Sequence, residues 1–232
     1  MTNDLSINDI SILYEDNHLI AVNKVNSELV QGDKTGDIPL AEKVRQYIRI
    51  KYEKQGNVFL GVTHRLDRPV SGAVLFAKTG KALSRMNTLF RNSEIKKNYW
   101  AIVKNRPPEN EGALIHYLVR NAAQNKSYSH ETEVAGSKKA ILNYKVAGMS
   151  ENYYLLEIEL ITGRHHQIRS QLSGLGCPVK GDLKYGFPRS NKGGGIDLHA
   201  RELSFIHPVR KEQLTIIAPT PKDEIWSIFI NT

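Results

Sequence analysis

The pattern of apolar and polar residues predicts short β-strands at both ends of the chain. Near the N-terminus, the segments ISILY and LIAVN flank the polar turn EDNH, an arrangement typical of a β-hairpin. A buried strand is predicted from Ala73 to Ala77, because this apolar run stands between Gly72 and Gly80. Further strands are predicted at residues 99–103, 140–147, 153–161, 198–205 and 213–217.

Apolar residues at helical spacing predict three helices between these strands. The first begins near Asp37, ahead of Ile38-Pro39-Leu40, and the third ends at Gly176. A short fourth helix is expected at residues 224–230. The apolar positions of the three helices are Leu40, Val44, Tyr47 and Ile48; Leu83, Met86, Leu89 and Phe90; and Ile168, Leu172 and Leu175.

The order of these elements predicts an α+β fold. Strands do not alternate strictly with helices, which favours a central mixed, mostly antiparallel sheet flanked by helices over a doubly wound fold. The length of 232 residues fits one large domain or two small ones. Residues 188–195, PRSNKGGG, are expected to be a loop. The polar stretch 106–137 is irregular and is expected to hold a small strand pair or an insertion that faces the substrate.

The sequence shows no membrane span, signal peptide or disulfide, and these features bear on the compartment of the protein. No apolar run is long enough to span a bilayer, and the acidic start MTNDLSINDISILYED does not look like a signal peptide. The single cysteine, Cys177, rules out an internal disulfide and is expected to be a small buried residue. These features predict a cytoplasmic protein.

Charge indicates the class of partner. The 32 Lys and Arg residues exceed the 24 Asp and Glu residues, which gives a net charge of +8 and a pI near 9.4. A basic excess of this size fits a polyanion such as nucleic acid, but many proteins carry such surface charge, so charge alone favours nucleic acid only weakly. A membrane partner is not expected, because no basic amphipathic helix or lipidation signal is present.

Several common cofactor motifs are absent from the sequence. Thr79-Gly80-Lys81 lacks the earlier glycine and the following Ser or Thr of a phosphate-binding loop. Gly193 to Gly195 does not follow a predicted strand, and no Cys/His set has zinc spacing. Neither a metal nor a nucleotide cofactor is therefore expected.

The segment HRLDRPVSG, from His64 to Gly72, is the strongest candidate for chemistry. It places one acid, Asp67, among basic residues on a loop that leads into the predicted buried strand. Taken alone, Asp67 fits a surface turn or an ion pair. The whole segment, however, resembles the central motif of the RluA-type pseudouridine synthases, in which the motif aspartate is the catalytic residue.

Three more segments resemble motifs of that family in chain order. They are ILYEDNHLIAVNK (12–24), KKNYWAIV (96–103) and LITGRHHQIRSQLSGLGCPVKGDLKYG (160–186). Relatives usually have a proline after the lysine of the first motif, where this chain has Val25. The resemblance extends from about Ile12 to about Pro208, and it implies the pseudouridine synthase fold with an active-site cleft.

The resemblance implies a rearrangement that needs no cofactor. The bond between ribose and uracil nitrogen breaks, and the same uracil rejoins the ribose through carbon 5. Asp67 would act as the nucleophile or as an electrostatic and base partner. A single acid fits this rearrangement better than glycoside hydrolysis, which generally uses two carboxylates.

The resemblance also assigns roles to other residues. Tyr99 would stack on the uracil and take part in proton transfer, although a core position is equally compatible with its strand. Arg169 would pair with Asp67 and keep it ionised, with Arg164 as a second candidate for this role or a phosphate contact. Arg65 would fill the gap left by a flipped-out uridine. His64 and Gln167 complete the expected substrate-binding set, His64 chiefly by shaping the loop.

The sequence predicts a single pseudouridine synthase catalytic domain over residues 1–232, without a separate N-terminal RNA-binding module. The expected partner is ribosomal large-subunit RNA or transfer RNA. A monomer with no obligate protein partner is expected. Two other classes remain: a non-catalytic RNA-binding or RNA-chaperone protein, and a nucleoside hydrolase or glycosylase, which would usually carry a second acid or a metal cluster.

Overall fold

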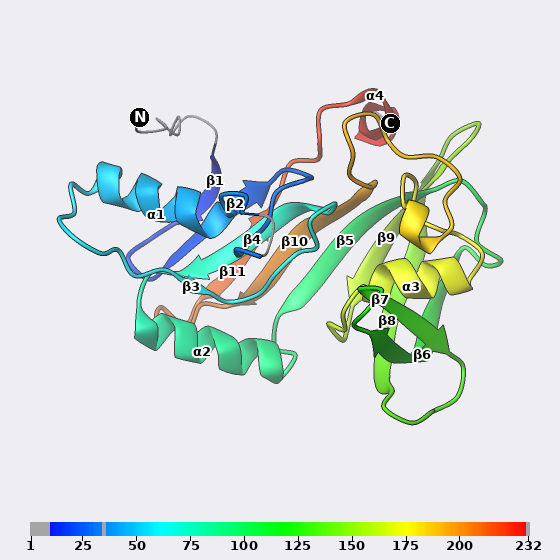
Figure 1. Cartoon of the computed structure of the whole chain (residues 1–232), viewed down its shortest axis with the longest axis horizontal. Helices are drawn as coiled ribbons and strands as arrows, with labels where there is room; N and C mark the ends of the chain where they lie inside the picture. Colours follow the sequence, from blue (N-terminus) through cyan, green and yellow to red (C-terminus); the bar gives the residue numbers. More distant parts are fainter. Residues whose placement is uncertain (1–9, 34–35, 231–232) are drawn as a thin grey trace. The chain divides into compact units, whose positions relative to one another are not determined.

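A computed structural model describes residues 10–33 and 36–230, which form two compact units. The first unit comprises the described residues up to Ile95 together with Glu202–Pro219. The second unit comprises residues 96–201 and the described residues from Thr220 onward. Figure 1 colours the chain from blue at the N-terminus to red at the C-terminus.

An antiparallel set of strands forms the sheet of the first unit. Strand β1 (Ser11–Glu15) pairs with β2 (Leu19–Lys24), and β2 pairs with β4 (Ser71–Ala77). The two-residue strand β3 (Gly61–Val62) also pairs with β4. Every residue of β4 is buried, as the apolar run predicts. The N-terminal hairpin and the buried strand are therefore confirmed.

Two helices and a second hairpin complete the first unit. Helix α1 spans Leu40–Lys51 and α2 spans Gly80–Arg91. Strand β11 (Gln213–Ile217) pairs antiparallel with the end of β10 (Leu198–Ile206). A core cluster joins β2, β4, α2, β10 and β11, with buried residues Leu19, Ala21, Ala73, Leu75, Ala77, Ala82, Met86, Ile95, Leu203, Phe205, Ile216 and Ala218.

Helix α1 begins at Leu40, close to the start predicted near Asp37, and no side chain among the described residues caps it. The first helical amides, of Leu40 and Ala41, donate to the carbonyls of Leu29 and Val30 at 2.7 and 3.1 Å. Asp37 lies three residues before the helix and forms an ion pair with Arg68 at 2.6 Å. The preceding loop therefore satisfies the helix terminus through its main chain, and Asp37 is used elsewhere.

The second unit is built on a five-stranded antiparallel arrangement in the order β5-β9-β8-β6-β7. Its strands are β5 (Lys96–Val103), β6 (Glu111–Asn121), β7 (Lys126–His130), β8 (Lys138–Met149) and β9 (Tyr154–Leu160). The polar stretch 106–137 thus contains the β6–β7 hairpin, a strand pair in which β6 is the longer strand. A strand pair is one of the two arrangements expected for this stretch. Figure 1 shows this hairpin in green below α3.

Two helices and one 3-10 turn belong to the second unit. Helix α3 (Gln167–Gly174) ends as predicted, because Gly176 adopts a left-handed conformation with φ of 81°. The 3-10 turn η2 (Leu183–Tyr185) follows, and α4 (Glu224–Ile230) buries Trp226 against Ile102 and Leu155. No helix in the described part of the chain is long and apolar enough to cross a membrane. Helices with antiparallel strands confirm the α+β class.

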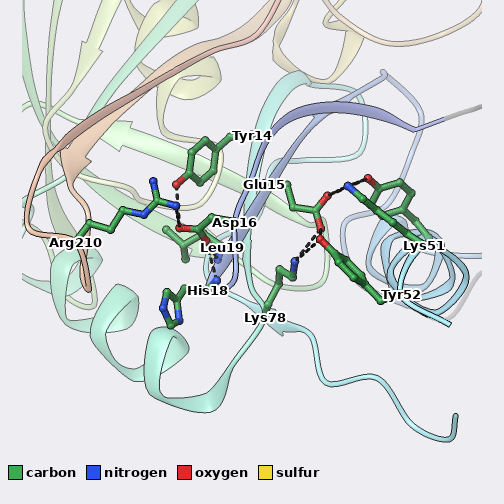
Figure 2. A network of polar contacts seen from close by, with 10 residues as sticks. Tyr14, Glu15, Asp16, His18, Leu19, Lys51, Tyr52, Lys78 and Arg210 are labelled. Carbon is green, nitrogen blue, oxygen red and sulfur yellow. Dashed lines mark hydrogen bonds and ion pairs between the residues drawn. The ribbon is translucent and has the colours of Figure 1, made fainter. Parts of the chain in front are cut away.

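Polar networks fix the turn between β1 and β2 (Figure 2). The Asp16 carboxylate accepts hydrogen bonds from the amides of His18 and Leu19, both at 2.7 Å, and from the Tyr14 hydroxyl at 3.0 Å. The neighbouring Glu15 carboxylate is almost fully buried.

Four donors surround the Glu15 carboxylate. Lys51 and Lys78 donate at 2.6 and 2.8 Å, while Tyr52 and Tyr47 donate at 2.8 and 2.9 Å. Burial by itself raises the pKa of Glu15, but these hydrogen bonds outweigh it and lower the pKa from 4.5 to about 2. The ionised carboxylate therefore ties α1 and the end of β4 to the hairpin.

Replacing Glu15 with glutamine should destabilise the protein at neutral pH by about 2 kcal/mol. Because the pKa of Glu15 is lower in the folded state, its contribution is complete above pH 4.5 and is lost as the pH falls toward 2. Urea unfolding at several pH values should therefore show the wild-type advantage shrinking over this range. A matched control is Glu42→Gln, an exposed carboxylate paired with Arg45, which should change stability by less than about 0.5 kcal/mol.

Candidate active site

Side chains continue the β-ladder where β3 ends, just before the Asp67 loop. Strand β3 pairs with β4 at Ala77 and Phe76. At the next position the Thr63 hydroxyl donates to the Leu75 carbonyl at 2.6 Å, and the Leu75 amide donates to His64 Nε2 at 3.0 Å. His64 therefore fixes the chain at the entry to the loop. Its contact with substrate stays a prediction.

Asp67 opens a tight turn that leads into β4. The Val70 amide donates to the Asp67 carbonyl at 3.0 Å, and both Leu66 and Val70 are buried. Arg65 is exposed between the anchored His64 and the buried Leu66. The loop thus presents Arg65 and Asp67 on a backbone held on both sides.

A buried lysine holds the far side of this turn. Lys24, at the end of β2, has 0% of its surface exposed. Its ammonium group donates to the carbonyls of Val25 at 3.0 Å, Arg68 at 3.0 Å and Val70 at 2.5 Å. Burial lowers the pKa of Lys24 to about 8, although the negative charges of Glu28 and Asp67 oppose that shift. Lys24 therefore brings a positive charge near Asp67 while it fixes the turn.

Arg68 ties the same turn to the loop after β2. The Ser27 amide donates to the Arg68 carbonyl at 2.9 Å, and Arg68 Nε donates back to the Ser27 carbonyl at 3.1 Å. With the ion pair to Asp37, these bonds fix the residue that follows Asp67. Lys24, Thr63 and Asp37 support the Asp67 loop through contacts that the sequence motifs do not indicate.

Tyr99 and Trp100 occupy successive positions of β5 in the second unit. Tyr99 is 8% exposed and pairs across the ladder with Ile158 of β9. Trp100 is half-buried, and the Arg201 guanidinium lies 4.7 Å from its ring centre. Successive strand residues point to opposite faces, so the two rings face different sides of the sheet.

Arg169 lies on α3 and is 5% exposed. Its Nε and Nη2 atoms bind the two carboxylate oxygens of Asp182 at 2.7 and 2.9 Å, and Asp182 is 1% exposed. The guanidinium also lies 5.0 Å from the ring centre of Tyr185. This bidentate pair fixes the plane and direction of the guanidinium. The pairing of Arg169 with Asp67, which belongs to the other unit, stays a prediction.

Gln167 shapes the loop before α3. Its Oε1 accepts from the Thr162 hydroxyl at 2.7 Å and from the Arg164 amide at 3.0 Å, and its Nε2 donates to the Ile141 carbonyl at 3.0 Å. The side chain is buried, so these internal bonds give it a structural task. Arg164 is exposed, and its Nε donates to the Lys139 carbonyl at 3.0 Å.

The adjacent histidines are arranged by stacking and hydrogen bonding within the protein. The rings of His165 and His166 stack with centres 3.8 Å apart, and His166 Nδ1 lies 3.0 Å from the Tyr185 hydroxyl. Burial and the nearby Arg169 charge lower the pKa of His166 to about 2, so its ring is neutral. Among residues 10–33 and 36–230, no three His, Cys, Asp or Glu side chains are grouped so that they could hold a metal ion.

Comparison with known proteins identifies the family. Residues 18–174 match the sequence family described as RNA pseudouridylate synthase, and this match contains Asp67, Tyr99 and Arg169. The chain belongs to this family. Members of the family are isomerases, and the family predicted from the sequence motifs is confirmed.

Curated relatives from several bacteria resemble most of this pseudouridine synthase chain. It is 32% identical over 215 residues to "Uncharacterized RNA pseudouridine synthase YjbO" of Bacillus subtilis (strain 168), covering 92% of this chain and 74% of that protein. It is 30% identical over 226 residues to "Ribosomal large subunit pseudouridine synthase D" of Zymomonas mobilis, covering 92% and 70%. Against "Uncharacterized RNA pseudouridine synthase slr1629" of Synechocystis, the chain spans 66% of the relative's length at 32% identity.

Solved structures show the same fold. "Human RNA Pseudouridylate Synthase Domain Containing 4" superposes with a TM-score of 0.78 at 23% identity, covering 95% of this chain and 90% of that chain. "Human RNA Pseudouridylate Synthase Domain Containing 1" gives 0.74 at 24% identity, covering 93% and 85%. The pseudouridine synthase fold expected from the motifs is therefore confirmed.

Replacing Lys24 with methionine should remove three hydrogen bonds to main-chain carbonyls, of which the bond to Val70 is buried, and destabilise the protein by about 2–4 kcal/mol. Urea unfolding measures this loss. The exposed Lys81 of α2 supplies the control, because Lys81→Met should change stability by no more than about 0.5 kcal/mol. Equal stability of the Lys24 variant and the wild type would contradict the anchoring role.

Proposed function

We propose that this chain is a cofactor-independent RNA pseudouridine synthase that uses Asp67 as its catalytic residue and ribosomal RNA as its substrate. The observation that carries the proposal is the position of Asp67. It is the one acid of a loop that is held by Lys24, by Arg68, and by the hydrogen bonds of Thr63 and His64 to the main chain of Leu75. Such support is typical of a group that must keep a fixed position during chemistry.

The reaction is balanced without a second reactant. The bond between ribose C1′ and uracil N1 breaks, a new bond forms between C1′ and C5 of the same uracil, the hydrogen at C5 leaves as a proton, and N1 takes up a proton. An anionic carboxylate beside C1′ assists the first step as a nucleophile or by stabilising developing positive charge. Asp67 supplies that carboxylate, and neither a redox cofactor nor an energy source is required.

Tyr99 and Arg169 are proposed to complete the catalytic group. The ring of Tyr99 would stack on the uracil, and its hydroxyl would take part in proton transfer. Arg169 would pair with Asp67 and keep it ionised. The bidentate bond to Asp182 supports this role, because it holds the guanidinium in one orientation before substrate arrives.

The choice of ribosomal RNA over transfer RNA rests on the relatives. The proteins named "Ribosomal large subunit pseudouridine synthase" C of Buchnera aphidicola and D of Zymomonas mobilis match 90% and 92% of this chain. A net charge of +8 fits either RNA. We propose a cytoplasmic enzyme that acts as a monomer and needs no protein partner.

The proposed chemistry is tested by tritium release from RNA labelled at uridine C5, taken from cells that lack the gene. Asp67→Ala should lower the rate of tritium release by about 100-fold to 10,000-fold, while its urea unfolding midpoint should stay close to that of the wild type. Glu42→Gln, which removes an exposed carboxylate, should release tritium at the wild-type rate. Mapping pseudouridine in the treated RNA names the substrate. Wild-type turnover by Asp67→Ala would contradict the mechanism, and binding without release by the wild type would favour an RNA-binding protein.

Arg65 is tested separately, as the residue proposed to replace the flipped uridine. Arg65→Ala should weaken RNA engagement and slow turnover about tenfold or more without changing stability, because the side chain is exposed. Arg65→Lys keeps the charge but loses the planar group, so it should recover RNA affinity better than turnover. Arg49→Ala, on the exposed side of α1, is the control. Wild-type affinity and rate in Arg65→Ala would refute insertion into the base stack.

A further inference from the structure

Lys97 is a half-buried cation that has no partner among the residues that the structure describes. It lies on β5, two residues before Tyr99, and residues two apart on a strand share one face about 7 Å apart. Within residues 10–33 and 36–230, Lys97 forms no hydrogen bond or ion pair, and burial lowers its pKa. By contrast, Lys180 in the same unit binds Asp197 at 2.8 Å. Desolvating an unpaired ammonium group is unfavourable, so the protein keeps Lys97 at a cost in stability.

The ammonium group of Lys97 lies beside Gly163, in the loop between β9 and α3. A Cβ atom added at Gly163 would be 4.0 Å from Lys97 Nζ, an ordinary contact distance, and it would meet no other neighbour within 4 Å. The φ angle of Gly163 lies outside the left-handed range that favours glycine. Neither packing nor backbone conformation therefore requires a glycine there. Its missing side chain leaves space next to the ammonium group.

The walls of this space are rigid. Gln167 fixes the loop from both sides of Gly163, because its Oε1 accepts from the Thr162 hydroxyl and from the Arg164 amide. Arg164, the residue after Gly163, is exposed and positively charged, and its Nε donates to the Lys139 carbonyl. A fixed loop, an open position and two cations are features of an anion-binding site.

We propose that Lys97 and the loop Thr162–Arg164 form a phosphate subsite that binds a backbone phosphodiester next to the target uridine. The inference rests on the proposed function, since it places the phosphate on the same strand face as Tyr99, which would stack on the base. The strand spacing between Lys97 and Tyr99 is comparable with the separation of a base and its own phosphate in a nucleotide. The tetrahedral phosphate oxygens accept from the compact ammonium group and from the exposed guanidinium.

Four variants of the full chain test this subsite. Lys97→Met should lower kcat/KM for tritium release about tenfold or more, mainly through KM, and should reduce the slope of log affinity against log salt by about 1. Its stability should equal or exceed that of the wild type, because an unpaired buried charge is removed. Lys97→Arg should keep the salt slope. Gly163→Ala should also raise KM, with unchanged stability.

Two controls match these changes. Lys96→Met removes the exposed neighbouring charge on the opposite strand face, and Gly80→Ala adds a methyl group at another glycine with open space. Both should behave like the wild type. Wild-type kcat/KM and salt slope in Lys97→Met would overturn the subsite, and so would a loss of activity that is matched by a loss of stability.

The order of measurement separates this inference from the proposed function. Asp67-dependent tritium release by the wild type is established first. If release is absent, the proposed function fails. The subsite is then tested by filter binding of the same RNA to wild type and Lys97→Met at salt concentrations from about 50 to 200 mM. The slope of log affinity against log salt reports how many phosphate charges the protein neutralises. A reduced slope supports the subsite and an unchanged slope refutes it.

Discussion

The ammonium group of Lys24 is fully buried and donates to three main-chain carbonyls, two of which follow Asp67 in the chain. These carbonyls lie just outside β2 and β4, where the ladder no longer supplies donors, and the Ser27 amide gives a second donor to the carbonyl of Arg68. Lys24 supplies all three donors from one side chain, and Thr63 and His64 satisfy the main chain of Leu75. The position of Asp67 depends on these side chains, because β3 is only two residues long.

The second unit follows the same principle with different chemistry. Gln167 uses its amide to shape the Thr162–Arg164 loop, and Asp182 uses both carboxylate oxygens to orient Arg169. In each case a buried polar residue forms hydrogen bonds that hold a neighbour with a proposed role in binding or catalysis. The exposed residues Arg65 and Arg164 thereby act from fixed loops, which reduces the entropy lost on binding.

The sequence predicted the elements with strong local patterns. β11 and α4 have the expected bounds, and β4 and α2 agree closely, because apolar spacing and flanking glycines define them. β7 was not resolved from sequence, because KSYSH has no apolar alternation and becomes a strand through its pairing with β6. The motifs indicated Asp67 and Arg169 as site residues. They did not indicate that Asp182 orients Arg169 or that Thr63 holds the loop of Asp67. Those roles depend on contacts between distant positions, which composition and periodicity do not encode.

The most direct test of the account is a crystal structure of the protein with substrate RNA that carries 5-fluorouridine at the mapped position. Fluorine replaces the hydrogen that must leave C5, so the last step is blocked and the bound nucleotide is retained. If Asp67 is the catalytic residue, the base will be flipped out, with C1′ against the Asp67 carboxylate, the ring on Tyr99, and Arg169 within hydrogen-bonding distance of Asp67. A retained nucleotide bound far from Asp67, or a base still stacked in the RNA, would contradict this role of Asp67.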